Sequence, residues 1–305
     1  MRHVLVTGAT GKIGSQLAPR LAAREDIAVR ALVRSAERAA PLEASGVELA
    51  PGRLEDCRAV ALAMQGIDTL VLITPAGPDA AEQAGAVMGI ARRVGVRKIV
   101  RISAFKAALD APTDIARQHG RTEMEIQASG LTHVFLRPPF FLQNLCVLAA
   151  RGIATEGKLY LGMGEARVGM IDLRDVVDCA EQSVISDAYD DEVLTLTGPE
   201  SIGCHDLASR LSCILGCAIQ YVSVTPEGVR QSVRALGFSD WYAEAMGDYS
   251  RAYRAGWGDV TTDHVSRITG RPARSFDAFA REILVPGLGT LTSPRRRSRP
   301  GAVRC

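Results

Sequence analysis

The sequence lacks any apolar run that approaches the roughly 20 residues of a membrane-spanning helix. It also lacks an internal repeat, and its first expected strand already begins at residue 3, so we expect no secretory signal peptide. Hydrophobic residues make up 47% and charged residues 23% of the 305 residues, which is the ordinary composition of a globular protein. The chain is long enough for one large or two modest domains, and we expect it to be cytoplasmic and not bound to a membrane.

A strong excess of one charge is absent too, since 36 Lys and Arg face 34 Asp and Glu. The last sixteen residues, "TLTSPRRRSRPGAVRC", hold five arginines and no acidic residue, so the rest of the chain is slightly acidic. A near-neutral body argues against a nucleic-acid partner. The proline and small polar residues among these arginines predict a disordered basic tail over 289–305.

The seven cysteines do not form the even, clustered set of a secreted disulfide framework. Cys213 and Cys217 lie four residues apart, with Cys204 and His205 upstream, which is one possible metal-binding face. Small buried residues on a helix explain this spacing better. We therefore expect no metal site.

What the sequence does contain is a regular alternation of strand-like and helix-like segments in its first half. Nearly continuous Val, Ile and Leu runs, typical of strands buried on both faces, occur at 3–8, 28–33, 47–52, 68–74, 97–103 and 132–138. Helical patterns lie between them at 12–23, 56–64, 79–94 and 115–129, with Asp56 and Asp79 as expected N-caps. This order predicts a doubly wound parallel α/β sheet, the Rossmann fold, over residues 1–150.

The second half predicts a smaller C-terminal α/β substrate domain over 151–288. A strand at 167–172 and a helix from near Asp175 are followed by a strand, a helix and a strand between 191 and 227. We expect these later segments to extend the edge of the first sheet and to cover its carboxyl end.

Three glycines, Gly8, Gly11 and Gly14, directly follow the first strand and precede the first helix. In this position glycine permits a tight turn, lets a phosphate approach the backbone, and lets the helix pack closely on the strand. The helix start then offers free N–H groups and a positive dipole end to a pyrophosphate. A structural turn is the alternative, but the strand–turn–helix context favours dinucleotide binding.

The end of the second strand carries Arg34 and Ser35, where an NAD site places an acidic residue. A guanidinium grips the 2′-phosphate of NADP, whereas a carboxylate repels it. We therefore expect NADPH to be preferred over NADH, the alternative being that Arg34 is a solvated loop residue.

The stretches "VTGATGKIG", "LVRS", "HGRTEMEIQASGLTHVFLRPPFFLQN" and "LTGPESIGCHDLASRLSCILGCAIQYVSVTPE" resemble the atypical short-chain dehydrogenase/reductases. More narrowly, the chain resembles the NmrA-like branch, which includes type 2 NAD(P)H:quinone oxidoreductases and redox-sensing regulators. The resemblance spans residues 3 to about 285. It implies a cofactor site made of Gly8, Thr10, Gly11, Lys12, Ile13, Gly14, Arg34, Ser35, Thr74, Pro75, Ser103 and His119.

One feature of the wider reductase group, a Tyr-x-x-x-Lys pair that protonates the substrate, is missing at the matching place. Aligning the acid at Glu123 puts Ile115 at the tyrosine position and His119 at the lysine position. A hydroquinone anion is better stabilised than an alkoxide, so quinone reduction does not need this pair. His119 then has two open roles, a proton donor with an ordinary pKa near 6.5 or a ligand of the nicotinamide ribose.

Phe140 and Phe141 followed by Asn144 come after the sixth strand, at the edge where such sheets bind ligands. They are expected as the substrate pocket, an apolar wall and a hydrogen-bonding group, with burial in the core as the alternative. The sequence therefore predicts an NADPH-dependent reductase of a quinone or related aromatic carbonyl substrate. An NADP-binding redox-sensing regulatory protein is the rival reading, and a homodimer is left open.

Overall fold

The computed structural model describes residues 1–292 of the chain. These residues form two compact units. Met1–Pro138 together with Val176–Thr195 make the first unit, and Pro139–Asp175 with the chain from Leu196 onward make the second. The division of the chain at residue 150 into a cofactor-binding and a substrate-binding domain stays a prediction. The packing itself changes at residue 138, and the chain returns to the first unit for one helix and one strand.

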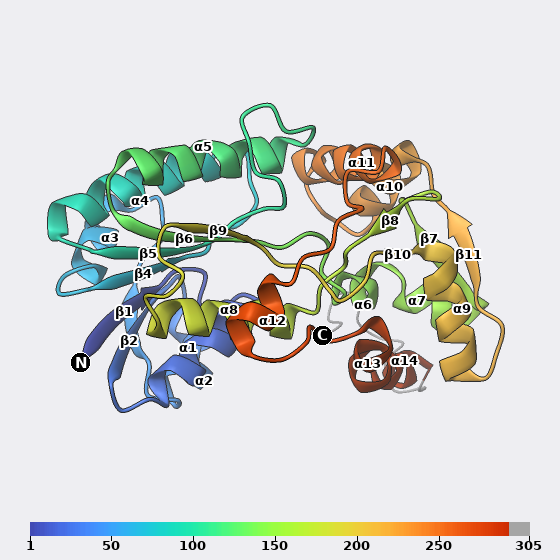
Figure 1. Cartoon of the computed structure of the whole chain (residues 1–305), viewed down its shortest axis with the longest axis horizontal. Coiled ribbons are helices and arrows are strands. Elements are labelled where there is room, and N and C mark those ends of the chain that lie inside the picture. The colour runs from blue at the N-terminus through green and yellow to red at the C-terminus, as the bar shows by residue number, and fades with distance from the viewer. Residues whose placement is uncertain (293–305) are drawn as a thin grey trace. The chain divides into compact units, whose positions relative to one another are not determined.

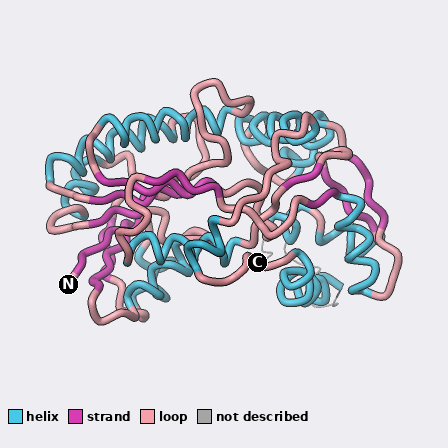
Figure 2. The backbone as a smooth tube through the Cα atoms, in the orientation of Figure 1, coloured by secondary structure: helices cyan, strands magenta, loops and turns pink. Residues whose placement is uncertain are grey.

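The first unit is built on a seven-stranded sheet in which every neighbouring pair runs parallel. Its order is β3-β2-β1-β4-β5-β6-β9, so the chain reverses direction across the sheet between β1 and β4. The strands are β1 (Arg2–Val6), β2 (Ile27–Val33), β3 (Glu48–Pro51), β4 (Thr69–Leu72), β5 (Lys98–Ile102), β6 (Thr132–Arg137) and β9 (Glu192–Thr195). Figure 2 shows these strands lying side by side. The predicted Rossmann fold is confirmed.

Helices cover both faces of this sheet. In Figure 1, α3, α4 and α5 lie on one face, and α1, α2 and α8 on the other. Their bounds are α1 (Gly14–Ala22), α2 (Ala36–Glu43), α3 (Cys57–Ala63), α4 (Ala80–Val94), α5 (Asp114–Ala128) and α8 (Leu173–Ile185). The central strand β4 is buried along its whole length, and its apolar residues are continuous rather than alternating, as expected of a strand covered on both faces.

The helix α2 is not among the segments that the sequence analysis named, and two details of that analysis are wrong. The side chain of Asp56 caps α3 by accepting from Arg58 N and Ala59 N, as expected. Asp79 stands at the N-cap position of α4, but its side chain makes no capping hydrogen bond there. The strand expected over 167–172 shortens to β8 (Arg167–Val168).

The second unit is mostly helical and contains two small sheets. Antiparallel β8 and β10 form one, and parallel β7 and β11 form the other. Its remaining elements are α6 (Asn144–Leu148), α7 (Ala150–Glu156), β7 (Lys158–Leu161), β10 (Ile202–Gly203), α9 (Cys204–Leu215), β11 (Gln220–Ser223), α10 (Pro226–Ala235), α11 (Asp240–Arg254), α12 (His264–Thr269), α13 (Phe276–Phe279), the π-helical η1 (Ala280–Leu284) and α14 (Val285–Thr292). The expected edge strand is β9, which pairs with β6 of the first unit's sheet.

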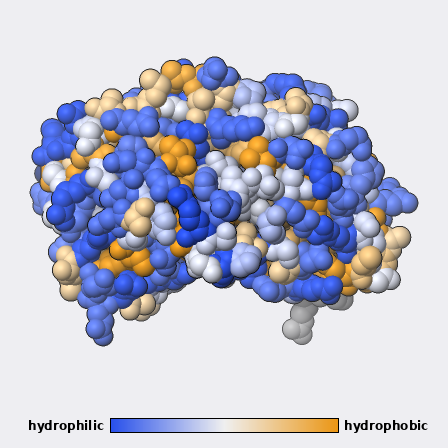
Figure 3. Space-filling view, viewed as in Figure 1, coloured by the Kyte–Doolittle hydropathy of each residue, from blue (hydrophilic) through white to orange (hydrophobic). Residues whose placement is uncertain are grey.

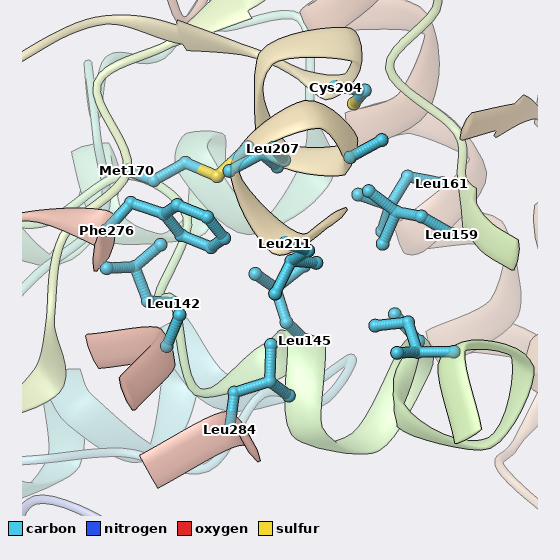
Figure 4. Packing of buried hydrophobic residues seen from close by; sticks show 14 of the residues in the cluster. Leu142, Leu145, Leu159, Leu161, Met170, Cys204, Leu207, Leu211, Phe276 and Leu284 are labelled. Carbon is cyan, nitrogen blue, oxygen red and sulfur yellow. The ribbon is translucent and has the colours of Figure 1, made fainter. Parts of the chain in front are cut away.

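A separate hydrophobic core holds the second unit together. Figure 4 shows leucines of α6, β7 and α9 converging with Met170 and Phe276. Leu211 of α9 and Leu145 of α6 lie at its centre, and both are fully buried. Since these residues come from segments far apart in the chain, the unit depends on tertiary packing rather than on local pattern.

The predicted tail lies largely outside the described residues. Its first part, 289–292, belongs to α14 and is therefore helical rather than disordered. Between Met1 and Thr292, no helix has the length and apolarity needed to cross a bilayer. On the face of the molecule shown in Figure 3, hydrophobic residues are scattered among hydrophilic ones.

Candidate functional site

The glycine turn after β1 is a place where side chains cannot fit. Gly8 has a φ of +60°, and a Cβ on it would lie 3.0 Å from the carbonyl oxygen of Ile73. A Cβ on Gly14 would lie 2.5 Å from the carbonyl oxygen of Gly8, well inside contact distance. Position 8 therefore needs glycine for its backbone conformation, and position 14 needs glycine so that α1 can pack closely on the turn.

The tip of the same turn is open to solvent. Thr10, Gly11 and Lys12 are exposed, and the N–H of Gly11 donates to the Gly8 carbonyl at 2.9 Å to close the turn. The N–H groups of Lys12 and Ile13, just before α1, donate to no protein acceptor within residues 1–292. Unpaired N–H groups at a helix start form an anion cradle, so these residues fit the pyrophosphate of a dinucleotide.

Thr7 ties this turn to the end of β4. Its buried hydroxyl donates to the carbonyl of Ile73 at 2.9 Å and accepts from the Ile73 N–H at 2.9 Å. The turn therefore lies against the segment that follows β4, at the point where the strand order reverses. Ligands of doubly wound sheets bind at this point, outside the carboxyl ends of the strands.

Arg34 and Ser35 lie where the sequence places them, directly after β2. Arg34 is exposed and makes no ion pair within the described part of the chain. Ser35 is the N-cap of α2, and its hydroxyl oxygen accepts from Arg38 N at 3.4 Å. Arg34 is therefore free to contact a ligand, whereas the Ser35 hydroxyl already serves the helix.

A buried arginine, Arg101, was not predicted from the sequence. It lies in β5, only 1% of it is exposed, and it is among the largest fully buried side chains. Its Nη2 donates to the hydroxyl of Thr74 at 2.9 Å and lies 3.2 Å from Nδ1 of His119, and its Nη1 donates to the Leu72 carbonyl at 3.3 Å. Burial lowers the pKa of Arg101 to about 10, which still leaves it charged at neutral pH.

The pKa of His119, on α5, is lower than that of an ordinary histidine. Burial lowers its pKa well below the usual value, and the charges of Arg101 and Arg137 lower it further. The ordinary pKa near 6.5 expected from the sequence is therefore wrong at this position. The neutral form of the His119 imidazole is therefore favoured more strongly than in an ordinary histidine, while its role as a proton donor or a ribose ligand stays a prediction.

Ser103 and Glu123 form a second buried contact beside this pair. The hydroxyl of Ser103 donates to Glu123 Oε1 at 2.5 Å. Arg137, the last residue of β6, donates from Nε to the same oxygen at 3.0 Å and from Nη2 to Oε2. Glu123 is only 3% exposed, and its charge is compensated by the Arg137 guanidinium. The Ser103 proton is thus committed to Glu123.

The other expected site residues fall in two places. Pro75 is exposed just after Thr74. Phe140, Phe141 and Asn144 belong to the second unit and are partly buried, and Phe140 packs against that unit's core. The backbone of Phe141 pairs with Ile171. The structure therefore brings together Gly8–Gly14, Thr74, Ser103 and His119 on the carboxyl edge of one sheet.

The signal for Arg101 was present in the sequence. The strand "RKIVRIS" contains a charged residue between apolar ones in a segment predicted to be buried on both faces. A buried charge needs partners, and its partners usually belong to a site. Which residues those are could not be read from the strand itself, because Thr74 and His119 come from other elements.

Comparison with known proteins places the chain among nucleotide-binding proteins. A family described as NAD(P)H-binding matches residues 8–163. The NAD(P)H azoreductase of Xenophilus azovorans is 35% identical over 282 residues, covering 91% of this chain and 96% of the azoreductase. Quinone oxidoreductase 2 of Escherichia coli is 24% identical over 276 residues, covering 90% of this chain and 96% of its own length.

The same architecture occurs in a solved structure. The crystal structure of an Escherichia coli NADPH-dependent quinone oxidoreductase complexed with NADPH superposes with a TM-score of 0.82. The match covers 95% of this chain and all of that one, at 21% sequence identity. At this identity the likeness establishes the fold.

Proposed function

The chain belongs to the NAD(P)H-binding family, and from this premise we propose that it is an NADPH-dependent reductase of a quinone or a related flat aromatic substrate. Its relatives include an NAD(P)H azoreductase and a quinone oxidoreductase. The proposal agrees with the resemblance seen in the sequence. The observation that carries it is the polar cluster of Arg101 and His119 beside the glycine turn.

The residues of the turn fit the cofactor. Gly8, Thr10, Gly11, Lys12, Ile13 and Gly14 would hold its pyrophosphate through backbone N–H groups and the start of α1. The exposed guanidinium of Arg34 would contact the 2′-phosphate, with Ser35 next to it. Thr74, Pro75 and Ser103 would lie along the remainder of the cofactor. When bound, the reduced nicotinamide supplies a hydride.

His119 then acts as a hydrogen-bond donor rather than an acid. Reduction of a quinone takes up a hydride and a proton, and the resulting negative charge is delocalised over an aromatic ring. A neutral imidazole N–H stabilises such a charge without giving up its proton, which comes from water. Ile115 cannot donate a proton, and no tyrosine of the sequence is followed four residues later by lysine.

Replacement of His119 distinguishes its two possible roles, a ligand of the nicotinamide ribose and a hydrogen-bond donor to the substrate. A ligand of the nicotinamide ribose would change cofactor affinity when it is replaced. A donor to the substrate oxygen would change turnover instead. Phe140, Phe141 and Asn144 are proposed as substrate contacts, two aromatic rings and an amide suited to a planar molecule.

The test is NADPH oxidation by the purified full-length chain with a panel of quinones and azo compounds, followed by absorbance. We expect turnover with at least one quinone, and His119→Ala to lower it about 10- to 100-fold while the NADPH dissociation constant changes little. Arg30→Gln is the control, since Arg30 is a half-buried strand arginine that bonds the carbonyls of Ala63 and Gln65. If NADPH binds but no acceptor oxidises it, the reductase is ruled out and a redox-sensing regulator takes its place.

A further inference from the structure

The guanidinium of Arg101 has its donors divided between three acceptors. Both N–H groups of Nη2 are used, one toward Thr74 Oγ1 at 2.9 Å and one toward Nδ1 of His119 at 3.2 Å. Nη1 donates to the Leu72 carbonyl at 3.3 Å, while the buried Nε has no partner among the described residues. Leu72 is the last residue of β4, and Thr74 lies two residues beyond it. The guanidinium therefore links the end of β4 to α5 through hydrogen bonds.

This contact decides which nitrogen of His119 carries the proton. A guanidinium has only donors, so the nitrogen that it contacts has to accept. Nδ1 is therefore unprotonated, and the single proton of the neutral ring sits on Nε2. The Nε2–H is left as the donor of the ring, and His119 as a whole residue is half-buried.

The charges around the ring favour the same state. Arg101 of β5 and Arg137 of β6 face His119 from the sheet, and both disfavour an added proton. On α5 itself, Glu123 lies one helical turn beyond His119, but its carboxylate is taken up by Arg137 and Ser103. Burial acts in the same direction. No anion in this group is left to stabilise an imidazolium.

We propose that Arg101 is a positioning residue, which holds His119 as a neutral ring with its proton on Nε2 and so presents a fixed N–H donor to the reacting oxygen of the substrate. The last step of this inference rests on the proposed reductase activity. The state of the ring does not, because it follows from the contact between Arg101 and Nδ1.

The contact is continuous with the cofactor cradle. Gly8 lies against Ile73, the next residue along is Thr74, and Thr74 accepts from Arg101. Thr7 bonds both backbone groups of Ile73. The orientation of the His119 ring is thereby tied to the segment that the glycine turn packs against, all within the first unit.

The direct test is a long-range ¹H–¹⁵N correlation spectrum of the histidine side chains in the wild-type protein without ligand. The sequence has five histidines, and the spectrum of His119→Gln identifies the signal of His119. We expect a pyridine-type Nδ1 and a protonated Nε2 from pH 8 to pH 5.5. A histidine with the ordinary pKa would be about nine-tenths imidazolium at pH 5.5. An imidazolium at that pH, or a proton on Nδ1, would overturn the proposal.

Variants test the role of Arg101 in turnover. Arg101→Met removes the donors and the charge with a similar volume, and we expect His119 to titrate at higher pH and kcat to fall about 10-fold or more. The KM for NADPH should change by less than about threefold. Arg101→Lys, which keeps one charged donor, should restore part of both properties. Arg30→Gln should leave the His119 spectrum and kcat as in the wild type.

The two proposals fail in different ways. If no acceptor is reduced but the His119 spectrum is as expected, the reductase fails and Arg101 still holds the ring. If Arg101→Met is folded and lowers kcat while the His119 spectrum is unchanged, Arg101 does not act through His119 and the inference is overturned. If Arg101→Met does not fold, the wild-type spectrum and Arg101→Lys still decide.

Discussion

Three arginines of the first unit show how far surroundings change one side chain. Arg34 is exposed and unpaired within residues 1–292, Arg101 is buried and bonds neutral groups, and Arg137 is paired with the buried Glu123. A guanidinium remains charged in all three settings, so its charge is stabilised differently in each: by solvent at Arg34, by neutral hydrogen-bond acceptors at Arg101 and by a carboxylate at Arg137. Only Arg34 has its charge available to an anionic ligand.

Replacing Arg34 with aspartate should therefore change cofactor choice. Loss of a charge-assisted contact and addition of a negative charge should weaken NADPH binding roughly 10- to 100-fold. NADH, which lacks the 2′-phosphate, should bind about as well as before. Fluorescence titrations with both cofactors measure this. Equal weakening of the two would remove Arg34 from the 2′-phosphate site.

The depressed pKa of His119 also predicts a pH dependence of stability. Below about pH 6.5 the unfolded chain protonates this ring, whereas the folded chain keeps it neutral. The stability that the neutral ring contributes is thus present above pH 6.5 and is lost as pH falls below it.

Wild type should lose stability relative to His119→Gln between pH 7.5 and pH 5.5. The slope should approach but not exceed about 1.4 kcal/mol per pH unit, the limit for one proton. Urea unfolding of both proteins across this range gives the difference. Parallel stability curves would mean that the ring titrates normally in the fold.

At the scale of elements, α1 and α5 cover opposite faces of the sheet, and each positions one part of the candidate site. Gly14 begins α1 and lets it approach the turn, as its added Cβ would lie 2.5 Å from Gly8 O and 2.6 Å from the Ala9 Cα. On α5, Ile115, His119 and Glu123 follow one another at the spacing of one helical face. These two packings hold the cradle and the histidine in one place.

Gly14→Ala should destabilise the chain by about 1–3 kcal/mol, because backbone atoms have to move to admit the methyl group. It should also weaken NADPH binding, since the start of α1 shifts away from the turn. Gly89→Ala is the matched control, a glycine inside α4 whose added Cβ would meet nothing closer than Arg93 Nη1 at 3.7 Å. There alanine should stabilise the helix by roughly 1 kcal/mol. Thermal melts with and without NADPH test both variants, and an unaffected Gly14→Ala would disprove the close packing.

At the scale of the whole molecule, two separate cores support two units. Leu70 and Phe135 belong to the core of the first unit, and Leu145 and Leu211 to that of the second. The glycine turn, Arg34, Arg101 and His119 all belong to the first unit. Cofactor affinity should therefore depend on the first core and not on the second.

Leu211→Ala should lower the free energy of unfolding by about 2–5 kcal/mol, because it leaves a cavity in the second core. The NADPH dissociation constant of the folded variant should stay within about twofold of wild type. Leu62→Ala, at a leucine of α3 that is 56% exposed, should change stability by less than about 0.5 kcal/mol. A large loss of NADPH affinity in Leu211→Ala would show that binding depends on the second core as well.

The sequence by itself determined the parallel sheet, the glycine turn and the place of Arg34. These depend on local causes, namely continuous apolar runs, glycine spacing and the end of a strand. It also predicted that the chain returns to the sheet edge, which β9 does.

Only the tertiary structure decided what the polar residues do. The Ser103 hydroxyl donates a hydrogen bond to Glu123, the Arg101 guanidinium contacts both Thr74 and His119, and the pKa of His119 falls below its ordinary value. These properties come from burial and from charges on β5, β6 and α5, three separate elements whose side chains meet only in the folded chain. A pKa is a difference in free energy between two charge states in one particular surrounding, so it becomes defined when packing brings those elements together.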